Sequence, residues 1–511
     1  TMMKAICKYI LVVILMTMAI SCDDFLETTS QDLIVPKTVE HYKELLQGEG
    51  YFKEFLAKSV FALYMTDDVE YFDAVAGGSW GGFGDSNFES YGDSYKWETE
   101  IENDVMTDRC YQYLYKQILV ANTCISALDE MEGTDAEKKI LSGQAHFTRA
   151  FGYFLLANFY AQAYNEAQAT DPCVPLVLDP TPTMEKFPRA TMEEVWGRIK
   201  SDVEEAISSL EKANISGIYE INYGAALILG VRVALFMEDF DLVIEYGEKV
   251  LKINSSLYDI TDKPVSTGTS SPSSSNFQDK FIYPANNPEI MWLYDNGEKE
   301  SHYDVFYVGG ILAGDCISIS SAASNSIVSM FDYQIVETEG GNVIEGDKRF
   351  TYWIIAPSAS YYPYVPIKYD HYNIVGEDYQ SSFRTGEVYI SLAEAYARKT
   401  NPEIDKVLEY LNALRSHRIK PYTSLNSGDF ASVDALIKFV WDERRRELCF
   451  EEHHRWWDLR RTGQPALSHT WMGGEVYKLK EKDPAYVINF PQLEREFNSA
   501  LNNARPIRLP E

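Results

Sequence analysis

Seven cysteines are spread through the 511 residues, and none of them forms a CxxC pair or a spacing typical of metal ligands. The sequence therefore predicts neither a disulfide framework nor a metal site. Positive charge is also scarce, because 46 Lys and Arg stand against 77 Asp and Glu, which gives a formal net charge of -31 at pH 7. Binding to nucleic acid depends on clustered Lys and Arg, so this composition argues against a nucleic-acid partner.

Signals for catalysis are weak. The glycine-rich run that ends at Gly84 is followed by Asp85, where a phosphate-binding loop needs Lys and then Ser or Thr. Two pairs of adjacent carboxylates occur, at 67–68 and at 451–452. Hydrolysis of a glycosidic bond, however, needs two carboxyl groups that face each other across the substrate. The sequence favours a binding protein over an enzyme, and it predicts no cofactor.

The first residues are typical of an export signal. Two lysines precede an apolar run at residues 9–20, which is shorter than the roughly 20 residues that a transmembrane helix needs. The run leads into Ser21-Cys22, and a small residue before such a cysteine resembles a lipobox. We therefore expect residues 1–21 to be a lipoprotein signal peptide and Cys22 to carry the lipid anchor. The alternative is a plain secretory signal with an incidental cysteine.

Amphipathic patterns predict that the chain is mainly helical. Apolar residues recur at helical spacing in several segments, and Thr191 with Glu194 has the sequence of a capping box. Short turns between successive helices suggest tetratricopeptide-type helix pairs at about 104–253 and 381–418. The helices are expected at 111–129, after Gly133 through 159, 191–210, 222–237, 241–253, 384–399 and 404–417. Residues 254–380 lack this periodicity and are expected to form a loop-rich, partly β insert.

One run near the C-terminus is unusually dense in charge. Residues 441–461 read WDERRRELCFEEHHRWWDLRR and contain no Gly or Pro before Gly463. The run predicts a single helix that stops at Gly463, with Asp442/Arg446 and Glu451/Arg455 paired at i,i+4 spacing. We expect its Arg and Glu side chains to pair with each other and to cap neighbouring backbone.

The same run resembles the signature of the SusD/RagB family of outer-membrane lipoproteins. The family pattern Glu-Arg-Arg-x-Glu-Leu, then Phe-Glu, then Arg-aromatic-aromatic-Asp-Leu-Arg-Arg is present, with one additional residue in the gap. Shorter matches occur at 145–156, 174–177, 346–350 and 488–503. The resemblance implies a mainly α, SusD-like fold built on tetratricopeptide-type helix pairs. It also implies that residues 22–511 form a single domain.

The resemblance further implies a function. A SusD-type protein is a surface-exposed, lipid-anchored subunit that captures oligosaccharide for a SusC-type TonB-dependent transporter in the outer membrane. Two alternatives remain open from the sequence: a peptide-binding subunit of a RagB-type uptake complex, and an interaction scaffold that binds no ligand. The family is not known for catalysis.

Sugar binding requires aromatic faces together with polar hydrogen-bonding groups. The loops near residues 66–97 and 300–365 are rich in both, and the resemblance places ligand contacts in these regions. The alternative role for each aromatic residue is packing in the interior. This alternative applies in particular to Trp97, which precedes the first predicted helix. The candidate ligand-binding residues are Asp67, Tyr71, Trp80, Trp97, Tyr303, Tyr307 and Tyr361.

Overall fold

The computed structural model describes a defined set of residues, which make up most of the chain between residues 36 and 510. They are 36–72, 87–98, 101, 107–181, 183–263, 281, 287–296, 316–321, 325–338, 341–355, 364–366, 368, 379, 381–503 and 508–510.

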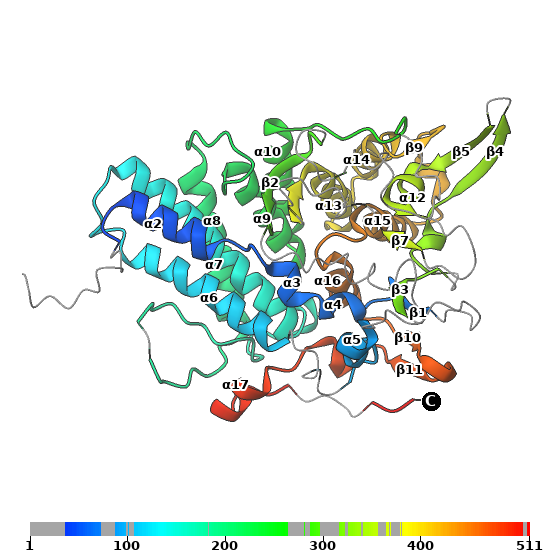
Figure 1. Ribbon diagram of the computed structural model, residues 1–511. Coiled ribbons are helices and arrows are strands. Elements are labelled where there is room, and N and C mark those ends of the chain that lie inside the picture. The colour runs from blue at the N-terminus through cyan, green and yellow to red at the C-terminus, as the bar shows by residue number, and fades with distance from the viewer. Residues whose placement is uncertain are drawn as a thin grey trace, which may run out of the picture.

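Long helices form one half of the molecule, as the periodicity predicts (Figure 1). Each helix packs against the next in the chain, so that α6 lies on α7, α7 on α8, α8 on α9, and α9 on α10. The mainly α fold class is confirmed. The helices are α6 (Thr107–Ser126), α7 (Asp135–Tyr160), α8 (Met192–Leu210), α9 (Tyr223–Phe236) and α10 (Phe240–Ile253).

Capping side chains explain where two of these helices begin. The hydroxyl of Thr191 accepts from the backbone N–H of Glu194, and the Glu194 carboxylate accepts from the backbone N–H of Thr191, which confirms the predicted capping box. Thr134 and Glu137 form the same arrangement at the start of α7. Both boxes satisfy backbone donors that the first helical turn leaves unpaired.

The helices resume after the insert and join the first group directly. α10 packs against α13 (Thr385–Arg398), which also contacts α14 (Ile404–Ser416) and α15 (Val433–Leu448). The contact between α10 and α13 is close at Gly247, where an added Cβ would lie 2.7 Å from Leu392 Cδ2. The insert therefore leaves and rejoins a continuous stack of helices.

Most of the small antiparallel sheets lie on the other side of the molecule, and the β2–β8 sheet lies beside α9 (Figure 1). β1 (Val69–Phe72) pairs with β3 (Cys316–Ile319), and β2 (Ile290–Tyr294) pairs with β8 (Ser381–Arg384). The β4–β5 ribbon (Tyr333–Thr338 and Gly341–Asp347) projects from the body and also pairs with β9 (Ile419–Lys420). The remaining pairs are β6 (Ile354–Ile355) with β7 (Val365–Pro366), and β10 (Leu467–Thr470) with β11 (Val476–Leu479).

The prediction of one helix over residues 441–461 is wrong. The helix α15 ends at Leu448, and α16 (His454–Arg461) begins after a turn. Phe450 and Glu452 adopt positive φ values of 63° and 46°, which a continuous right-handed helix cannot contain. The expected i,i+4 pairs are absent from this described segment as well. Asp442 pairs with Lys438 and Arg446 with Glu443, while Glu451 and Arg455 reach residues on other elements.

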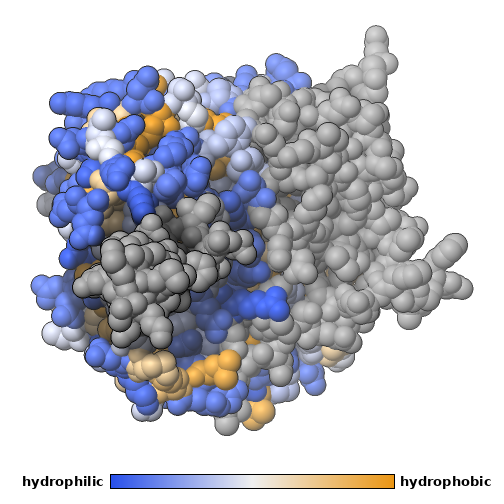
Figure 2. All heavy atoms as spheres, turned by 60° about the vertical axis from the view of Figure 1, so that its left-hand side comes forward, coloured by the Kyte–Doolittle hydropathy of each residue, from blue (hydrophilic) through white to orange (hydrophobic). Residues whose placement is uncertain are grey.

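Shorter helices complete the described structure. They are α2 (Val39–Leu45), α3 (Phe55–Ser59), α4 (Phe61–Tyr64), α5 (Asn87–Tyr95), α12 (Lys348–Trp353) and α17 (Gln492–Phe497). One cluster of buried apolar residues extends from Val39 to Leu501 and includes residues of both halves. The face of the helical half in Figure 2 is mostly hydrophilic where it is described, with small apolar patches. Among the described helices, none combines the length and the hydropathy that crossing a membrane requires.

Candidate functional site

Arginine and glutamate side chains form a buried network at the centre of the molecule. Arg384, on β8, donates from Nη1 to Glu289 Oε2 at 2.7 Å and to Glu447 Oε1 at 2.8 Å. It also donates from Nε to Glu451 Oε2 at 2.9 Å. Because Glu447 lies on α15 and Glu451 in the turn before α16, this one side chain ties the turn to the sheet formed by β2 and β8.

Neighbouring cations complete the network. Arg418 and Arg349 also bind Glu447, and Lys368 binds Glu451. Burial by itself would raise the pKa of the Glu447 carboxyl, but Arg418 and Arg384 hold that pKa well below its ordinary value. All of these side chains are inaccessible to solvent or nearly so. The charged run thus acts mainly as an internal scaffold, and its carboxylates bind arginines from distant parts of the chain.

The scaffold extends to β1 through a second set of ion pairs. Arg455, on α16, donates to both oxygens of Asp67, from Nε to Oδ1 at 2.7 Å and from Nη2 to Oδ2 at 2.8 Å. Arg445, on α15, donates from Nε to Asp68 Oδ1 at 2.8 Å. Both aspartates lie immediately before β1, so the two arginines fix where this strand begins. The carboxylate of Asp67 is therefore engaged by Arg455.

Trp97 lies in the interior. Its ring is fully buried, stacks on the imidazole of His469 at a centroid distance of 4.1 Å, and donates from Nε1 to the carbonyl of Met65 at 2.9 Å. The residue adopts φ 54° at the end of the segment that contains α5. Trp97 thus packs the support of the predicted ligand region and presents no face to a ligand.

His469 organises this support, and the sequence analysis did not single it out. Its ring lies between those of Tyr95 and Trp97, with centroid distances of 4.1 Å to each. Its Nδ1 and Nε2 atoms lie 2.7 Å and 2.9 Å from the carbonyl oxygens of Tyr95 and Thr66. Burial lowers the pKa of His469 to about 4. The local sequence around His469, the short run LSHTW between turn residues, does not indicate which rings stack on the imidazole.

Tyr71 is a half-buried member of an aromatic group beside β1. Its ring lies 5.7 Å from that of Trp471, which also contacts Tyr95 at 5.5 Å. The backbone N–H of Tyr71 donates to the Tyr95 hydroxyl at 2.8 Å, and that hydroxyl donates to the carbonyl of Thr470 at 3.0 Å. Lys96 extends over the Trp471 ring. β1, α5 and the β10–β11 hairpin are thereby held together.

The pairing of β1 with β3 brings the two predicted ligand regions together. Phe72, the last residue of β1, is the register partner of Cys316, the first residue of β3. Residues 73–86 follow Phe72 in the chain, and residues 297–315 precede Cys316. Both aromatic-rich segments are therefore attached at the same end of one two-stranded sheet. Several predicted site residues lie outside the described residues, namely Cys22, Trp80, Tyr303, Tyr307 and Tyr361.

The described part of the chain contains no group of three or more His, Cys, Asp or Glu side chains arranged to hold a metal ion. Four of its cysteines, Cys110, Cys124, Cys173 and Cys449, are free and buried. Burial raises the pKa of each thiol to about 12, so these residues pack as small apolar side chains.

Comparison with known families gives two matches in separate parts of the chain. Residues 67–230 match a model described as SusD-like, starch-binding and associating with the outer membrane. Residues 330–509 match the model of the SusD family. The first match begins at Asp67, and the second contains the whole charged run. No curated protein matches the sequence.

Solved structures share the fold over more than 90% of this chain at low sequence identity. A SusD superfamily protein from Bacteroides fragilis is 20% identical with a TM-score of 0.62, and the alignment covers 91% of this chain and 99% of that one. A SusD superfamily protein from Bacteroides thetaiotaomicron is 17% identical with a TM-score of 0.62, covering 92% and 100%. A SusD-like carbohydrate-binding protein from Bacteroides vulgatus is 16% identical with a TM-score of 0.61, covering 92% and 98%.

Proposed function

Because the chain belongs to the SusD/RagB family, we propose that it captures oligosaccharides at the cell surface for import through a SusC-type TonB-dependent transporter. Cys22 carries the lipid anchor, residues 1–21 are removed, and residues 22–511 form the single mature domain. The helix pairs form a rigid body that docks on the transporter. The ligand binds at the loops attached to β1 and β3.

One observation carries the ligand assignment. The register partners Phe72 and Cys316 attach two aromatic-rich segments to one end of the same sheet. These segments contain Trp80, Tyr303 and Tyr307, and flat aromatic rings next to polar groups are what a sugar ring requires. Arg455 and Arg445 hold the strand that supports them. A fixed support of this kind lowers the ordering cost when ligand binds.

The carboxylates support binding rather than hydrolysis. Asp67 and Asp68 are paired with Arg455 and Arg445, and Glu451 is paired with Arg384. None of the three is presented as the free acid or base that glycosidic hydrolysis needs. Residues 77–81 do have the spacing GxSxG, which in hydrolases places a serine at a sharp turn between strand and helix. Product release by the wild type and by a Ser79→Ala variant tests this point: we expect neither protein to hydrolyse the glycan, and both to bind it equally.

The function is tested by affinity electrophoresis and calorimetry on the chain from residue 23 onward, with a panel of polysaccharides and a mixed peptide pool. We expect one polysaccharide to retard the protein, and Trp80→Ala or Tyr307→Ala to abolish the retardation. Phe497→Ala is the matched control, because Phe497 is an exposed aromatic residue on α17, away from β1 and β3 (Figure 1). Binding to peptides alone would support the RagB-type alternative. Binding to neither polysaccharide nor peptide would favour an interaction scaffold that binds no ligand.

A further inference from the structure

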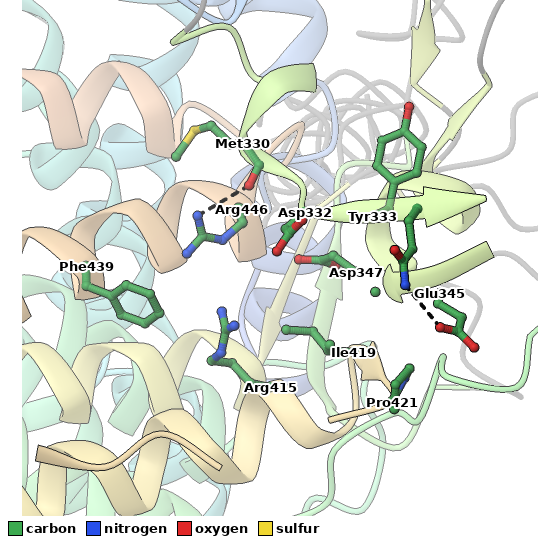
Figure 3. Close-up of a pocket in the computed structure, with 12 residues that line it drawn as sticks. Met330, Asp332, Tyr333, Glu345, Asp347, Arg415, Ile419, Pro421, Phe439 and Arg446 are labelled. Atoms are coloured by element: carbon green, nitrogen blue, oxygen red, sulfur yellow. Dashed lines mark hydrogen bonds between the residues drawn. The ribbon is translucent and has the colours of Figure 1, made fainter. Parts of the chain in front are cut away.

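A pocket of about 480 Å³ lies between the β4–β5–β9 sheet and the helices α14 and α15 (Figure 3). It is separate from the β1–β3 sheet, and every residue that lines it is described. Its floor comes from the two helices and its rim from the three strands. The lining residues that the argument uses are Asp332, Gln334, Glu345, Arg415, Phe439 and Arg446.

Two guanidinium groups point into this pocket (Figure 3). Arg446 donates from Nε and Nη2 to Glu443 Oε2 at 3.0 Å and 2.8 Å, and Arg415 donates to the same oxygen. Both guanidinium carbons lie over the ring of Phe439, at 5.2 Å for Arg415 and 5.6 Å for Arg446. Nη1 of Arg446 makes only a long contact, 3.5 Å, with the carbonyl of Met330, and Nε of Arg415 has no hydrogen-bond partner among the described residues. Glu443 therefore holds both cations in place, and each guanidinium group keeps N–H groups beyond those that bind Glu443.

At the floor, Arg415 and Arg446 share the single carboxylate of Glu443. Burial would raise the pKa of Glu443, but Arg349, Arg415 and Arg446 hold it well below its ordinary value, so this carboxylate is ionised near neutral pH. Its other oxygen already faces Arg349 Nη2 at 2.8 Å. One carboxylate is therefore shared among three guanidinium groups. Asp347, which also lines the pocket, is bound on both of its carboxylate oxygens by Arg349.

We propose that this pocket binds the carboxylate of an acidic sugar residue, a hexuronic acid, with Arg415 and Arg446 as its ligands. Planar guanidinium groups match a carboxylate in shape and charge. The rim carries the exposed Asp332 and Gln334 together with Glu345, which accepts from Gln334 Nε2 at 3.2 Å. Gln334 and Glu345 accept from and donate to sugar hydroxyls, whereas the negative charge of Asp332 opposes the bound carboxylate. The volume is in the range of small-molecule sites, roughly 300 to 1,000 Å³.

The pocket alone supports a carboxylate as the bound group. That a sugar bears this carboxylate depends on the proposed function. The protein as a whole carries a net charge of -31, so a pair of half-buried arginines side by side in one pocket is a specific complement for an anion. An acidic peptide side chain is the competing occupant, and the experiment distinguishes the two.

Calorimetry on the chain from residue 23 onward tests the proposal with glucuronate, galacturonate, their neutral parents glucose and galactose, and glutarate as a carboxylate without a sugar ring. We expect a sugar acid to bind at least about tenfold more tightly than its neutral parent, since a hydrogen-bonded charge pair contributes on that order. Equal affinity for acid and neutral sugar would overturn the proposal. Glutarate binding as tightly as the sugar acids would overturn the assignment to a sugar.

Variants locate the site. Arg446→Gln should weaken sugar-acid binding about tenfold, and Arg446→Lys should weaken it less, because Lys keeps the charge without the fork. Lys438→Gln removes one positive charge from the same helix at a position that is 73% exposed, and it should leave binding unchanged. Asp332→Asn removes a negative charge from the rim and should tighten binding, an effect that does not depend on whether the arginine variants fold. Equal losses in Arg446→Gln and Lys438→Gln, or weaker binding in Asp332→Asn, would contradict the site.

This outcome is distinguishable from failure of the proposed function. Trp80→Ala and Tyr307→Ala should abolish retardation by polysaccharide and leave the binding of free hexuronate unchanged. Loss of hexuronate binding in those two variants would place the carboxylate at the β1–β3 site and overturn the assignment to this pocket.

Discussion

Arg455 and Asp67 are joined by two parallel hydrogen bonds, which connect α16 to the residue that opens the segment leading into β1. The pair lies between the central scaffold and the ligand region. Burial would raise the pKa of Asp67, but Arg455 and Arg445 lower it well below the ordinary value. Asp67 is therefore a positioning residue for β1, and under the proposed function we expect any effect of Asp67 on the ligand to act through this strand.

Replacing Asp67 by Asn should destabilise the protein. The change leaves Arg455 in a mostly buried position without its counter-charge, and loss of a buried partner costs about 3 kcal/mol. Urea unfolding near pH 7 measures this free energy. The deficit should shrink as the pH falls, because the lowered pKa means that Asp67 contributes stability above its ordinary pKa and loses it as it becomes protonated.

Asp442→Asn is the matched control for this variant. Asp442 also pairs with a cation, but Lys438 is 73% exposed and lies one turn away on the same helix. An exposed pair of this kind contributes roughly 0.5 kcal/mol or less. Equal losses in the two variants would show that Asp67 is not held as the structure places it.

Gly386, at the start of α13, lies against the central network with no room for a side chain. An added Cβ would be 2.1 Å from Arg384 Nη1 and 2.6 Å from Glu289 Oε2. Gly386→Ala should therefore displace the Arg384–Glu289 pair and cost about 3 kcal/mol in the free energy of unfolding.

The contrast for Gly386 is Gly197, on the exposed side of α8. An added Cβ there meets nothing within 4 Å among the described residues. Gly197→Ala should stabilise the protein by about 0.5 to 1 kcal/mol, because alanine loses less backbone entropy in a helix. Thermal and urea unfolding of both variants measure the change in unfolding free energy, which should be a loss for Gly386→Ala and a gain for Gly197→Ala. Destabilisation by Gly197→Ala, or tolerance of Gly386→Ala, would contradict the packing described here.

Helix positions could be predicted from the sequence because their causes are local. The start of α8 follows from its capping box, and the extents of α8 and α10 follow from apolar residues at helical spacing. Both signals are visible within about 20 residues. The turn between α15 and α16 could not be predicted, because good helix formers fill it. What breaks the helix there is long-range: Glu451 binds Arg384, 67 positions away in the chain, and Glu452 binds Arg232, 220 positions away.

The candidate site shows the same limit. Its aromatic residues could be proposed because sugar binding has a known chemistry, but separating platforms from packing residues requires the partners. Trp97 is buried because His469 and Met65 meet it, and no local pattern relates these three positions. The junction of the two ligand regions depends on strands that are more than 240 residues apart, and a four-residue strand carries no signal for its pairing partner.

Glu452 provides a pH-dependent test of the network. Its carboxylate accepts from Arg232 Nη1 and Nη2 at 2.8 Å and 2.9 Å, but Arg232 is shared with Glu387. Its other ionisable neighbours are Tyr294, the buried carboxyl of Asp295, and the buried His454, whose pKa is lowered by burial. Burial, opposed by Arg232, raises the pKa of Glu452 to about 7. One cation between two buried carboxylates thus favours keeping a proton on one of them.

The sign follows from linkage. Between the ordinary pKa of glutamate and about 7, the native protein holds a proton that the unfolded chain has released. The contribution of this group to stability is therefore present at low pH and is lost as the pH rises through that window. Glu452→Gln removes the titration, so the variant should gain on the wild type by up to about 3 kcal/mol between pH 5 and pH 8.

Urea unfolding of wild type and Glu452→Gln at several pH values measures this difference directly. The slope of the difference reports the carboxylate of Glu452 together with its influence on the neighbouring Asp295 and Glu387, even if the amide costs stability at all pH values. Infrared difference spectra provide a second readout, since the carbonyl stretch of a protonated carboxylic acid should disappear in the variant. A difference in stability that stays constant with pH would mean that Glu452 is ionised throughout, with the proton held elsewhere around Arg232.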